Sequence, residues 1–454
     1  MTLAVVILAA GQGSRMKSAI PKVLHLLAGM PLLGHVIAAA RCLQPVQVIV
    51  VYGHEGDLVR QAFPDPDLTW VQQTEQLGTG HAVQQAMPML DSGVDRMLVL
   101  YGDVPLIQPS TLQTLLVSST GALGLLTLSL DDPTGYGRIQ RDADQKVIGI
   151  VEQKDANTEQ QAIREVNTGI MALPVQDAIG WLQNVSKNNQ QQEYYLTDLV
   201  AMAVQDGVPI EVTQPDKPIE AFGVNDRKQL AVVEREKQRM LADQLMLAGV
   251  TLQDPNRFDL RGELQYGQDC IIEPNVLIEG TVCLGDRVHI GANTILRHTK
   301  IANDVTILDQ CVIEDTLVGS GSRIGPFARL RPGTVLAQAT RVGNFVEIKQ
   351  SQIGSGSKVN HLAYVGDTEV GQNANLGAGT ITCNYDGANK HKTVIEDDVF
   401  VGSNSALVAP VTLGKGATIG AGSVITQNTP AGTLRLTRGQ PTNIPNWQRP
   451  KKHT

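Results

Sequence analysis

A glycine-rich turn follows the first apolar run of the chain and has the composition of a phosphate-binding loop. The run Leu3 to Ala10 leads into Gly11-Gln12-Gly13, where missing side chains let backbone N–H groups approach a phosphate. The dinucleotide pattern GxGxxG fails because Met16 stands where its third Gly would be. Arg15 and Lys22 lie close enough in sequence to offset the charge of a triphosphate. Taken alone, the GxG segment is equally readable as a tight turn.

A second candidate site is the segment Tyr101-Gly102-Asp103, which comes straight after the apolar run Met97 to Leu100. Ligands of open α/β sheets bind beyond the carboxyl ends of the strands. A carboxylate at that position, with a glycine beside it, is well placed to hold Mg²⁺ against phosphates. The alternative for Asp103 is a helix N-cap or a turn residue.

The elements that would position these groups alternate between strand and helix. Ala4 to Leu8, Val46 to Tyr52 and Met97 to Tyr101 are continuous apolar runs, as in strands buried on both faces. A helical pattern over Pro31 to Leu43 lies between them. This alternation predicts an α/β Rossmann-like, doubly wound domain.

A long helix is predicted between the two halves of the chain. Residues 227–248 contain no Gly or Pro and end at Gly249. Such a helix is about 33 Å long at 1.5 Å per residue. It has the composition of a rigid connector, and the alternative is a helix packed on the first domain.

The second half repeats an aliphatic residue every six positions, and the phase slips by one around Ile295, Ile301, Ile307 and Ile313. A period of six predicts a parallel β-helix in which three hexads, about 18 residues, close one triangular coil. We expect a left-handed helix with about eight to nine coils over 270–425. The polar segment Asn384 to Lys392 breaks the pattern and should protrude as a loop. The repeat positions are Val276, Val282, Val288, Val312, Val318, Ile324, Leu330, Leu336, Val342 and Ile348, then Val401, Leu407, Leu413, Ile419 and Ile425.

Composition excludes several classes of protein. The net charge is −8, so a nucleic-acid binder, which needs a basic footprint, is disfavoured. The 17 aromatic residues (6 Phe, 8 Tyr and 3 Trp) suit narrow coils better than a bulky core. The five cysteines show no CxxC spacing, which favours reduced thiols in a cytoplasmic protein. The apolar run near the start is too short to span a bilayer, so we expect no membrane insertion.

Taken together, these motifs resemble those of sugar-nucleotide pyrophosphorylases. With the hexad repeat behind them, nearly all 454 residues resemble the bacterial bifunctional N-acetylglucosamine-1-phosphate uridylyltransferase / glucosamine-1-phosphate N-acetyltransferase family. The resemblance implies a uridylyltransferase domain over 1–227, a linker helix over 228–248 and an acetyltransferase β-helix over 249–454. The further motifs that carry it are Leu77-Gly78-Thr79-Gly80-His81-Ala82, Asp132 to Arg138, Val151-Glu152-Gln153-Lys154 and Val166-Asn167-Thr168-Gly169.

The resemblance also implies roles for residues of the first half. Mg²⁺ would be held by Asp103, which ends the Tyr101-Gly102-Asp103 segment, and by Asn225. The phosphates of UTP would lie against Leu8, Ala9, Ala10 and Gly11, with Arg15 and Lys22. Uracil would be read by Gln73, Gly78 and Thr79, because an amide suits the donor–acceptor edge of an imide. The sugar would bind to Gly137, Glu152 and Asn167. Gln12 departs from the family, where Lys is frequent, and removes one cation.

In the second half, acetyl transfer from acetyl-CoA to an amine needs a base near pH 7, and histidine is the usual residue. The family's base position falls on His361, and we expect Glu347, close to one coil earlier, to orient its ring. A histidine packed on the coil wall is the alternative. The amino-sugar phosphate would be bound by Arg331, Lys349, Tyr364, Asn375 and Asn384. Acetyl-CoA would lie along Ala378, Asn384, Tyr385, Ser403, Ala421 and Arg438.

The sequence thus predicts an enzyme that acetylates glucosamine 1-phosphate and then couples the product to UMP from UTP. The resemblance implies a homotrimer. A single-activity pyrophosphorylase with a structural β-helix is the alternative enzyme, but it leaves His361 and the Asn384 to Lys392 loop without a role. A regulatory scaffold that binds sugar nucleotides without turnover is disfavoured by Arg15, Lys22 and Asp103.

Overall fold

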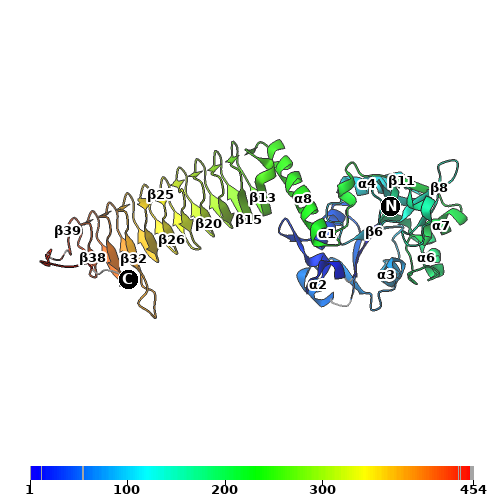
Figure 1. The fold of residues 1–454 in the computed structure, drawn as a ribbon, viewed down its shortest axis with the longest axis horizontal. Helices are drawn as coiled ribbons and strands as arrows, with labels where there is room; N and C mark the ends of the chain where they lie inside the picture. Colours follow the sequence, from blue (N-terminus) through cyan, green and yellow to red (C-terminus); the bar gives the residue numbers. More distant parts are fainter. Residues whose placement is uncertain (1, 12, 54–55, 438, 440, 450–454) are drawn as a thin grey trace. The chain divides into compact units, whose positions relative to one another are not determined.

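The computed structural model describes residues 2–11, 13–53, 56–437, 439 and 441–449. The chain divides into two compact units, Met1–Lys237 and Gln238–Thr454 (Figure 1). Within the described part of the chain, no helix is long and apolar enough to cross a membrane.

The N-terminal unit is built on a nine-stranded mixed sheet with the order β11-β7-β10-β6-β1-β4-β5, in which β8 also pairs with β10 and β9 pairs with β8. β1 pairs in parallel with both β4 and β6, as the apolar runs predicted, whereas β10 is antiparallel to β6 and β7. The elements are β1 (Leu3–Ala9), β2 (Leu26–Leu27), β3 (Met30–Pro31), α1 (Leu32–Cys42), β4 (Gln47–Tyr52), α2 (Gly56–Ala62), β5 (Leu68–Gln72), α3 (Thr79–Ala86), β6 (Arg96–Tyr101), α4 (Pro109–Ser118), β7 (Leu123–Ser129), β8 (Arg138–Arg141), β9 (Val147–Val151), α5 (Thr158–Gln161), β10 (Glu165–Pro174), α6 (Val175–Asn184), α7 (Asp198–Gln205) and β11 (Ile210–Thr213).

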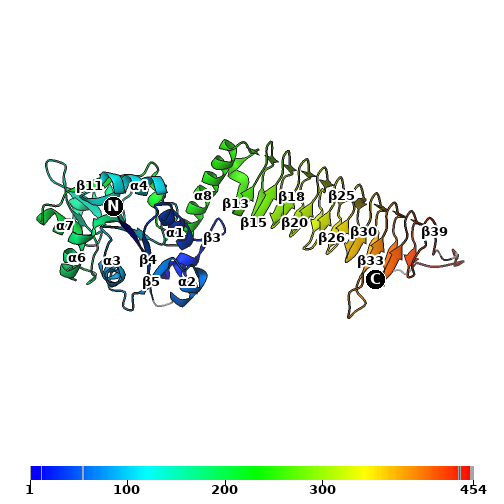
Figure 2. The same ribbon diagram turned by 180° about the vertical axis from the view of Figure 1, so that it is seen from behind.

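Two apolar cores, one on each face of this sheet, explain why its central strands are apolar at every position. Val5 and Ile7 of β1 pack on one face with α1, α2 and α4. Val6 and Leu8 pack on the other face with α3, α6 and α7 (Figure 2). Because β1 lies between β4 and β6, the loops after β1 and β6 meet at the point where the strand order reverses.

The predicted long helix is α8 (Arg227–Leu247), and the boundary between the units falls inside it. On its first part the Glu234 carboxylate accepts a hydrogen bond of 2.8 Å from Ala28 N. On its second part the Gln238 amide bonds to both backbone groups of Leu260, at 2.8 and 2.9 Å. Each part of the helix is thus bonded to its own unit. The domain boundaries 1–227, 228–248 and 249–454 stay predictions.

The second unit is a parallel β-helix, as the hexad repeat predicted (Figure 1). From β14 to β31, paired residues on successive coils are 17 or 18 positions apart, as in Arg323↔Arg341 and Arg341↔Lys358. One face is an 11-stranded sheet made of β12 (Thr251–Leu252), β14 (Ile271–Ile272), β16 (His289–Ile290), β19 (Thr306–Ile307), β22 (Arg323–Ile324), β25 (Arg341–Asn344), β28 (Lys358–His361), β31 (Asn375–Leu376), β34 (Phe400–Val401), β37 (Thr418–Ile419) and β39 (Leu434–Arg435).

The remaining strands of the coils form one continuous 17-stranded sheet. They are β13 (Phe258–Gln265), β15 (Val276–Leu284), β17 (Ile295–Arg297), β18 (Lys300–Ile301), β20 (Val312–Glu314), β21 (Leu317–Val318), β23 (Arg329–Leu330), β24 (Val335–Leu336), β26 (Glu347–Lys349), β27 (Gln352–Ile353), β29 (Tyr364–Gly366), β30 (Thr368–Val370), β32 (Ile381–Cys383), β33 (Thr393–Ile395), β35 (Ala406–Val408), β36 (Val411–Leu413) and β38 (Val424–Ile425).

The repeat positions form the core of these coils. All of them are buried except Ile295 and Val312, which are half-buried because Leu296 and Ile313 point inward instead. At Ile295 and Val312 the side chain that enters the core is therefore that of the next residue in sequence. The predicted loop protrudes between β32 and β33 (Figures 1 and 2).

Candidate functional site

A cavity of about 330 Å³ opens beyond the carboxyl ends of β1 and β6. Its lining brings together most of the predicted nucleotide-binding residues from four separate segments. Gln76 and Glu193 also line it and were not predicted; Gln76 follows β5 closely, whereas no sequence pattern points to Glu193. The predicted residues in the lining are Leu8, Ala9, Ala10, Gly11, Lys22, Gln73, Gly78, Thr79, Tyr101 and Asp103.

Gly13 is the residue that lets Lys22 approach the loop after β1. Its φ is +60°, in the left-handed region, and a Cβ added there would lie 2.7 Å from the Cβ of Lys22. Both the backbone conformation and the close approach therefore require glycine. Gln12, between the two glycines, lies outside the described residues.

Lys22 joins the two residues predicted to hold Mg²⁺. Its ammonium forms an ion pair with the Asp103 carboxylate and donates a hydrogen bond of 3.2 Å to Asn225 Oδ1. Arg15 donates to the same amide oxygen at 2.9 Å. Val224 N donates to the Asp103 carbonyl at 2.8 Å, which fixes the 223–225 segment beside the end of β6. Four side chains from three separate segments of the chain thus converge at one point.

A second cavity, of about 300 Å³, adjoins this point and is lined by Arg15, Tyr101, Asp103 and Asn225. Among the residues that the structure describes, no group of three or more His, Cys, Asp or Glu side chains could enclose a metal ion. One carboxylate and one amide oxygen do fit Mg²⁺, because this ion keeps several waters and takes further oxygens from substrate phosphates.

The start of α3 is pinned against the segment around Tyr194. Tyr194 N donates to Leu77 O and Gly80 N donates to Tyr194 O, both at 2.8 Å. Gly78 has φ +108°, and a Cβ there would lie 2.6 Å from Tyr194 O. Thr79 Oγ1 accepts from Leu196 N at 3.1 Å. The Gly78–Thr79 turn is therefore rigid where it faces the cavity.

Tyr101 and Gly102 help to hold the end of β6 in place beside the nucleotide cavity. Burial, together with the Glu152 and Asp103 carboxylates, raises the pKa of Tyr101. A Cβ on Gly169 would lie 2.5 Å from the Tyr101 ring, so the two residues pack closely. Gly102 is buried, and its N–H donates to Leu8 O at 2.9 Å, which ties β6 to β1.

The three predicted sugar residues lie next to one another. Asn167 N donates to Gly137 O at 2.9 Å, and the position of a Gly137 Cβ is 3.3 Å from the Glu152 carboxylate oxygens. Burial raises the pKa of Glu152, and the hydroxyl of Thr197, which donates to it at 3.0 Å, acts in the opposite direction. Thr197 was not predicted, because only the fold brings it to Glu152.

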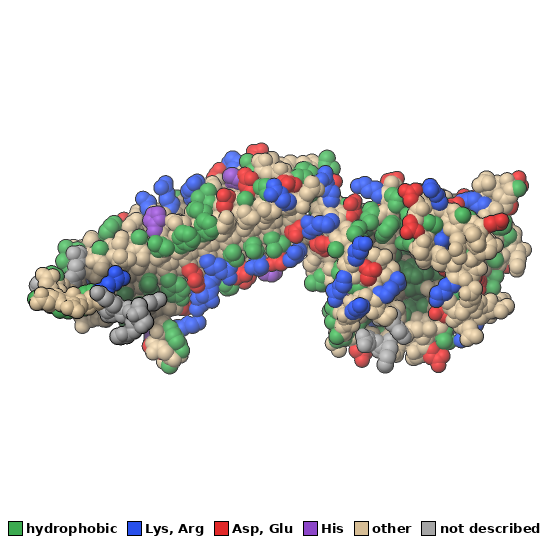
Figure 3. Space-filling model, viewed as in Figure 1, with side chains coloured by type: hydrophobic (Ala, Val, Ile, Leu, Met, Phe, Trp, Pro, Cys, Tyr) green, Lys and Arg blue, Asp and Glu red, His purple; other side chains and the backbone are tan. Residues whose placement is uncertain are grey.

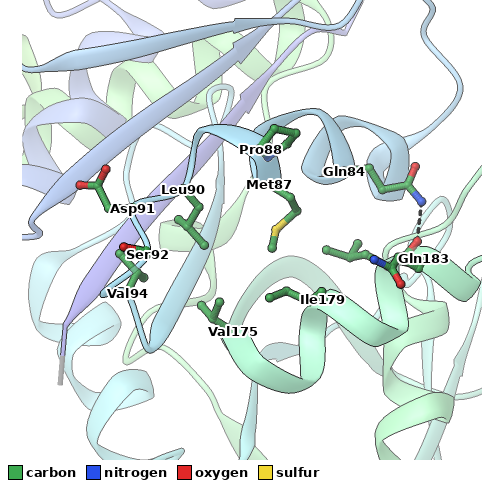
Figure 4. A pocket seen from close by; sticks show the side chains of 11 residues that line it. Gln84, Met87, Pro88, Leu90, Asp91, Ser92, Val94, Val175, Ile179 and Gln183 are labelled. Atoms are coloured by element: carbon green, nitrogen blue, oxygen red, sulfur yellow. Dashed lines mark hydrogen bonds between the residues drawn. The ribbon is translucent and has the colours of Figure 1, made fainter.

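A larger cavity, of about 480 Å³, lies between α3, the segment after it and α6 (Figure 4). Gln84 bridges the two helices by donating to Leu182 O at 2.5 Å. The lining is mainly apolar, with Asp91 as its one carboxylate and no Lys or Arg. This cavity offers nothing to neutralise phosphates and is not the nucleotide site.

On the β-helix, side chains of alternating charge stack from coil to coil and then change pattern. Figure 3 shows charged side chains of both signs along these coils. Arg297 pairs with Glu279 and Glu314, and Glu314 also pairs with Arg329. Two cations, Arg331 and Lys349, then follow the in-register pair Leu330↔Ile348 on neighbouring coils. The alternation therefore ends with two cations on neighbouring coils, each of which has a carboxylate nearby: Arg331 pairs with Glu347, and Lys349 lies 3.9 Å from Asp367.

Tyr364 and Asn384 lie beside these cations. A Cβ on Gly366 would meet the Tyr364 hydroxyl at 2.5 Å and the Asn384 amide at 2.9 Å. The Asn384 amide donates to the Asp367 carboxylate, which also lies 3.9 Å from the Lys349 ammonium. Two of the five residues predicted for the amino-sugar phosphate thus lie against Gly366, and a third, Lys349, is the in-register partner of that glycine on the preceding coil.

His361 ends β28, in the 11-stranded sheet, and Asn375 lies on the next strand of that sheet. The ring nitrogen Nδ1 lies 3.0 Å from Asn344 Oδ1, in the register pair Asn344↔His361. Glu347, predicted to orient the ring, instead pairs with Arg331 at 2.7 Å. The spacing of 14 residues was misleading, because the coil at this level contains 17.

The residues predicted for acetyl-CoA include a row along one corner of the coils. Ala378, Ser403 and Ala421 each lie two positions after the in-register residues Leu376, Val401 and Ile419. Tyr385 is exposed on the protruding loop. Arg438 lies outside the described residues.

The protruding loop is held closed by Asp386. Its carboxylate accepts from Asn389 N and Ala388 N, at 2.7 and 2.8 Å, and pairs with His391 at 2.6 Å. The Asn389 N–H, the His391 ring and the Ala388 N–H hold the pKa of Asp386 well below its usual range.

Comparison with known proteins agrees with the division of the chain into two units. Residues 5–125 match the MobA-like NTP transferase domain, residues 260–344 the GMPPB C-terminal domain, and residues 392–427 the hexapeptide repeat of succinyl-transferase.

Full-length relatives cover both units. The chain is 57% identical over 454 residues to the bifunctional protein GlmU of Acinetobacter baylyi, covering 100% of this chain and 99% of that protein. It is 54% identical over 453 residues to the same protein of Stutzerimonas stutzeri, with 100% of both chains covered. For the protein of Idiomarina loihiensis the identity is 55% over 452 residues, with 99% of both covered. With its nucleotidyltransferase unit and its hexapeptide coils both matched end to end, this chain belongs to the family of the bifunctional protein GlmU.

Proposed function

We propose that the cavity beyond β1 and β6 transfers UMP from UTP to N-acetylglucosamine 1-phosphate, and that the coils around His361 acetylate glucosamine 1-phosphate. The chain is a bifunctional enzyme of UDP-N-acetylglucosamine synthesis, a nucleotidyltransferase and an acyltransferase. Nucleotides and acetyl-CoA are its substrates. The observation that carries the assignment of the first site is the convergence of Lys22 and Arg15 on Asp103 and Asn225.

In the first reaction a phosphate oxygen of the sugar phosphate attacks the α-phosphorus of UTP, and pyrophosphate leaves. No protein nucleophile is needed, so the residues act by positioning and by neutralising charge. Leu8 to Gly11 would hold the phosphates through backbone N–H groups, with Arg15 and Lys22 as counter-charges. Gln73, Gly78 and Thr79 would read uracil.

Asp103 and Asn225 would hold Mg²⁺ through their side-chain oxygens. The bound ion would supply charge neutralisation at the phosphates. The Lys22 ammonium supports this assignment. It contacts side-chain oxygens of both Asp103 and Asn225, so one cation can reach the two residues at the same time.

Gly137, Glu152 and Asn167 would bind the sugar. The glycine leaves the backbone open to a sugar hydroxyl, while the carboxylate and the amide offer acceptors. Their mutual contacts support one subsite rather than three separate contacts.

In the second reaction His361 would act as the general base. Its Nδ1–H donates to Asn344 Oδ1, which leaves the lone pair of Nε2 free. The amine of glucosamine 1-phosphate loses a proton to Nε2 as its nitrogen bonds to the acetyl carbon. The C–S bond of acetyl-CoA then breaks, and the thiolate leaves and takes up a proton.

Arg331, Lys349, Tyr364, Asn375 and Asn384 would bind the amino-sugar phosphate. The position of Arg331 and Lys349 on neighbouring coils supports this assignment, because two adjacent cations suit a phosphate dianion. Acetyl-CoA would lie along Ala378, Ser403 and Ala421, with Asn384 and Tyr385 beside it and Arg438 near its phosphates.

A homotrimer is supported by one corner of the coils. Asn275, Asn293 and Gln310 occupy left-handed positions on successive coils, and the next three such positions are Phe327, Phe345 and Leu362. These apolar side chains are 44%, 56% and 62% exposed, and the two Phe rings stack at 5.2 Å. Bulky apolar residues in a strained, exposed conformation suit a surface covered by a second copy of the chain. The five cysteines are all free, which suits the cytoplasm.

Two substitutions in the full-length chain test the assignment. Asp103→Ala should abolish formation of the UDP-sugar and spare acetyl transfer, and His361→Ala should do the reverse. Both activities are measured on each variant, so that each serves as the folding control for the other. Normal UDP-sugar formation by Asp103→Ala would overturn the metal site, and retention of most acetyl transfer by His361→Ala would overturn the base.

A further inference from the structure

The Gln73 amide, at the wall of the nucleotide cavity, is held by two groups of the protein. The side chain is only 3% exposed. Its nitrogen Nε2 donates to the Gly78 carbonyl at 3.1 Å and lies 3.0 Å from His81 Nδ1. Both hydrogens of the amide are therefore used inside the protein, and only the oxygen is left for a ligand.

The polarity of these contacts follows from the Gly78 carbonyl, which can only accept. It requires the amide nitrogen on its side, whichever way the amide would otherwise turn. The second amide hydrogen then requires a lone pair on His81 Nδ1, so the ring proton is on Nε2. The Gln85 amide nitrogen lies 3.1 Å from Nε2. Because the oxygen and nitrogen of an amide are assigned from their contacts, the turned Gln85 amide, with its oxygen toward the ring, accepts the Nε2 proton. A turned Gln73 amide would place its oxygen 3.1 Å from the Gly78 carbonyl oxygen, which cannot donate.

The His81 ring is itself fixed in place. It stacks on Tyr194 with ring centroids 6.0 Å apart and an interplanar angle of 27°. Tyr194 is the residue whose backbone is bonded on both sides to the start of α3. The ring is therefore part of the rigid turn that carries Gly78 and is not a freely rotating side chain.

We propose that His81 is a positioning residue for base recognition, holding the Gln73 amide so that its oxygen faces the base. This inference rests on the proposed function of Gln73 as the reader of uracil. An oxygen at this place accepts the N3–H of uracil, whereas cytosine would present the lone pair of N3 to it. His81 thereby favours UTP over CTP without touching either nucleotide.

The test measures kcat and KM of the full-length enzyme for UTP and for CTP, with N-acetylglucosamine 1-phosphate and Mg²⁺. His81→Leu removes the acceptor and keeps an apolar contact with Tyr194. It should lower the UTP-to-CTP ratio of kcat/KM about tenfold, the scale of one lost hydrogen bond. The loss should appear in KM for UTP, with kcat changed by less than about twofold. Acetyl transfer by the same sample is the folding control and should be unchanged.

A conservative variant separates positioning from packing. His81→Asn carries an amide oxygen close to the place of Nδ1 and should restore the ratio to within about threefold of the unsubstituted enzyme. An unchanged ratio in His81→Leu, an equal loss on both nucleotides, or a failure of His81→Asn to restore the ratio would each overturn the role of His81.

Gln73→Ala distinguishes failure of this inference from failure of the assignment beneath it. If Gln73→Ala removes the preference for UTP and His81→Leu does not, only the inference about His81 is wrong. If Gln73→Ala leaves the preference intact, uracil is read elsewhere and both statements are wrong.

Discussion

Each unit pairs one histidine ring with one amide side chain, and the two pairs act in opposite directions. In the N-terminal unit the ring of His81 contacts the amide of Gln73, which is the proposed ligand contact of that pair. In the β-helix the amide of Asn344 contacts the ring of His361, and there the ring is the proposed ligand contact. Base recognition needs a fixed acceptor, which the ring enforces, whereas proton transfer needs a free ring nitrogen, which the amide secures.

The two pairs also differ in how the fold creates them. Gln73 and His81 are eight residues apart, on a strand-to-helix connection, and the amide is almost fully buried. Asn344 and His361 are 17 residues apart, stacked on successive coils, and the ring is exposed. A buried site can discriminate by itself, while an exposed one depends on what covers it.

The largest effect on activity is expected when the Asn344–His361 pair is disrupted by substitution of Asn344. Asn344→Leu should lower kcat/KM for acetyl transfer about 10- to 100-fold, by analogy with groups that orient a metal-bound imidazole through its other ring nitrogen. Asn344→Asp, which keeps an acceptor at Nδ1, should retain most of the activity. In the His361→Ala background Asn344→Leu should have no further effect, since the ring it orients is gone. An additive loss in that double variant would show that Asn344 acts in another way.

A smaller effect is expected at the exposed apolar corner. Phe345→Ser should weaken self-association and reduce acetyl transfer about tenfold at low protein concentration, because a covering copy would be lost. Sedimentation velocity gives the oligomeric state, and uridylyl transfer should be unchanged. A variant that stays fully assembled would count against this corner as the contact between copies.

The smallest effect is expected for the stability of the N-terminal unit when the Glu152 carboxyl group is replaced. Burial raises the pKa of Glu152, so its favourable contribution to stability is complete below the ordinary carboxyl pKa of 4.5 and is lost as pH rises through the raised value. Glu152→Gln should therefore raise the melting temperature of this unit by roughly 2–4 °C at pH 7. Fluorescence of Trp70 and Trp181 follows the transition. The gain should vanish at about pH 4, below that reference value, and a gain that persists there would contradict the sign.

The sequence was most informative where a period is imposed by packing. The hexad positions are buried because every coil needs one aliphatic side chain on each face, and the apolar runs of β1, β4 and β6 are buried because helices cover both faces. Spacing alone could not identify Asn344, since the choice between 17 and 18 residues per coil decides which side chain meets His361. Nor could it join Asp103 to Asn225, because a contact across more than a hundred residues leaves no local pattern; only the family resemblance suggested it.

The coil register has a consequence for how such a chain can change in length. Residues from Arg331 to Ala421 supply the proposed acetyl site, while the coils before β23 stack on them through the same repeating bonds. An insertion or deletion of one whole coil before β23 leaves every later partner opposite its neighbour. A change of six residues would instead rotate one face onto the next and separate Asn344 from His361 wherever it fell between them. Length variation tolerated by this architecture should therefore come in whole turns.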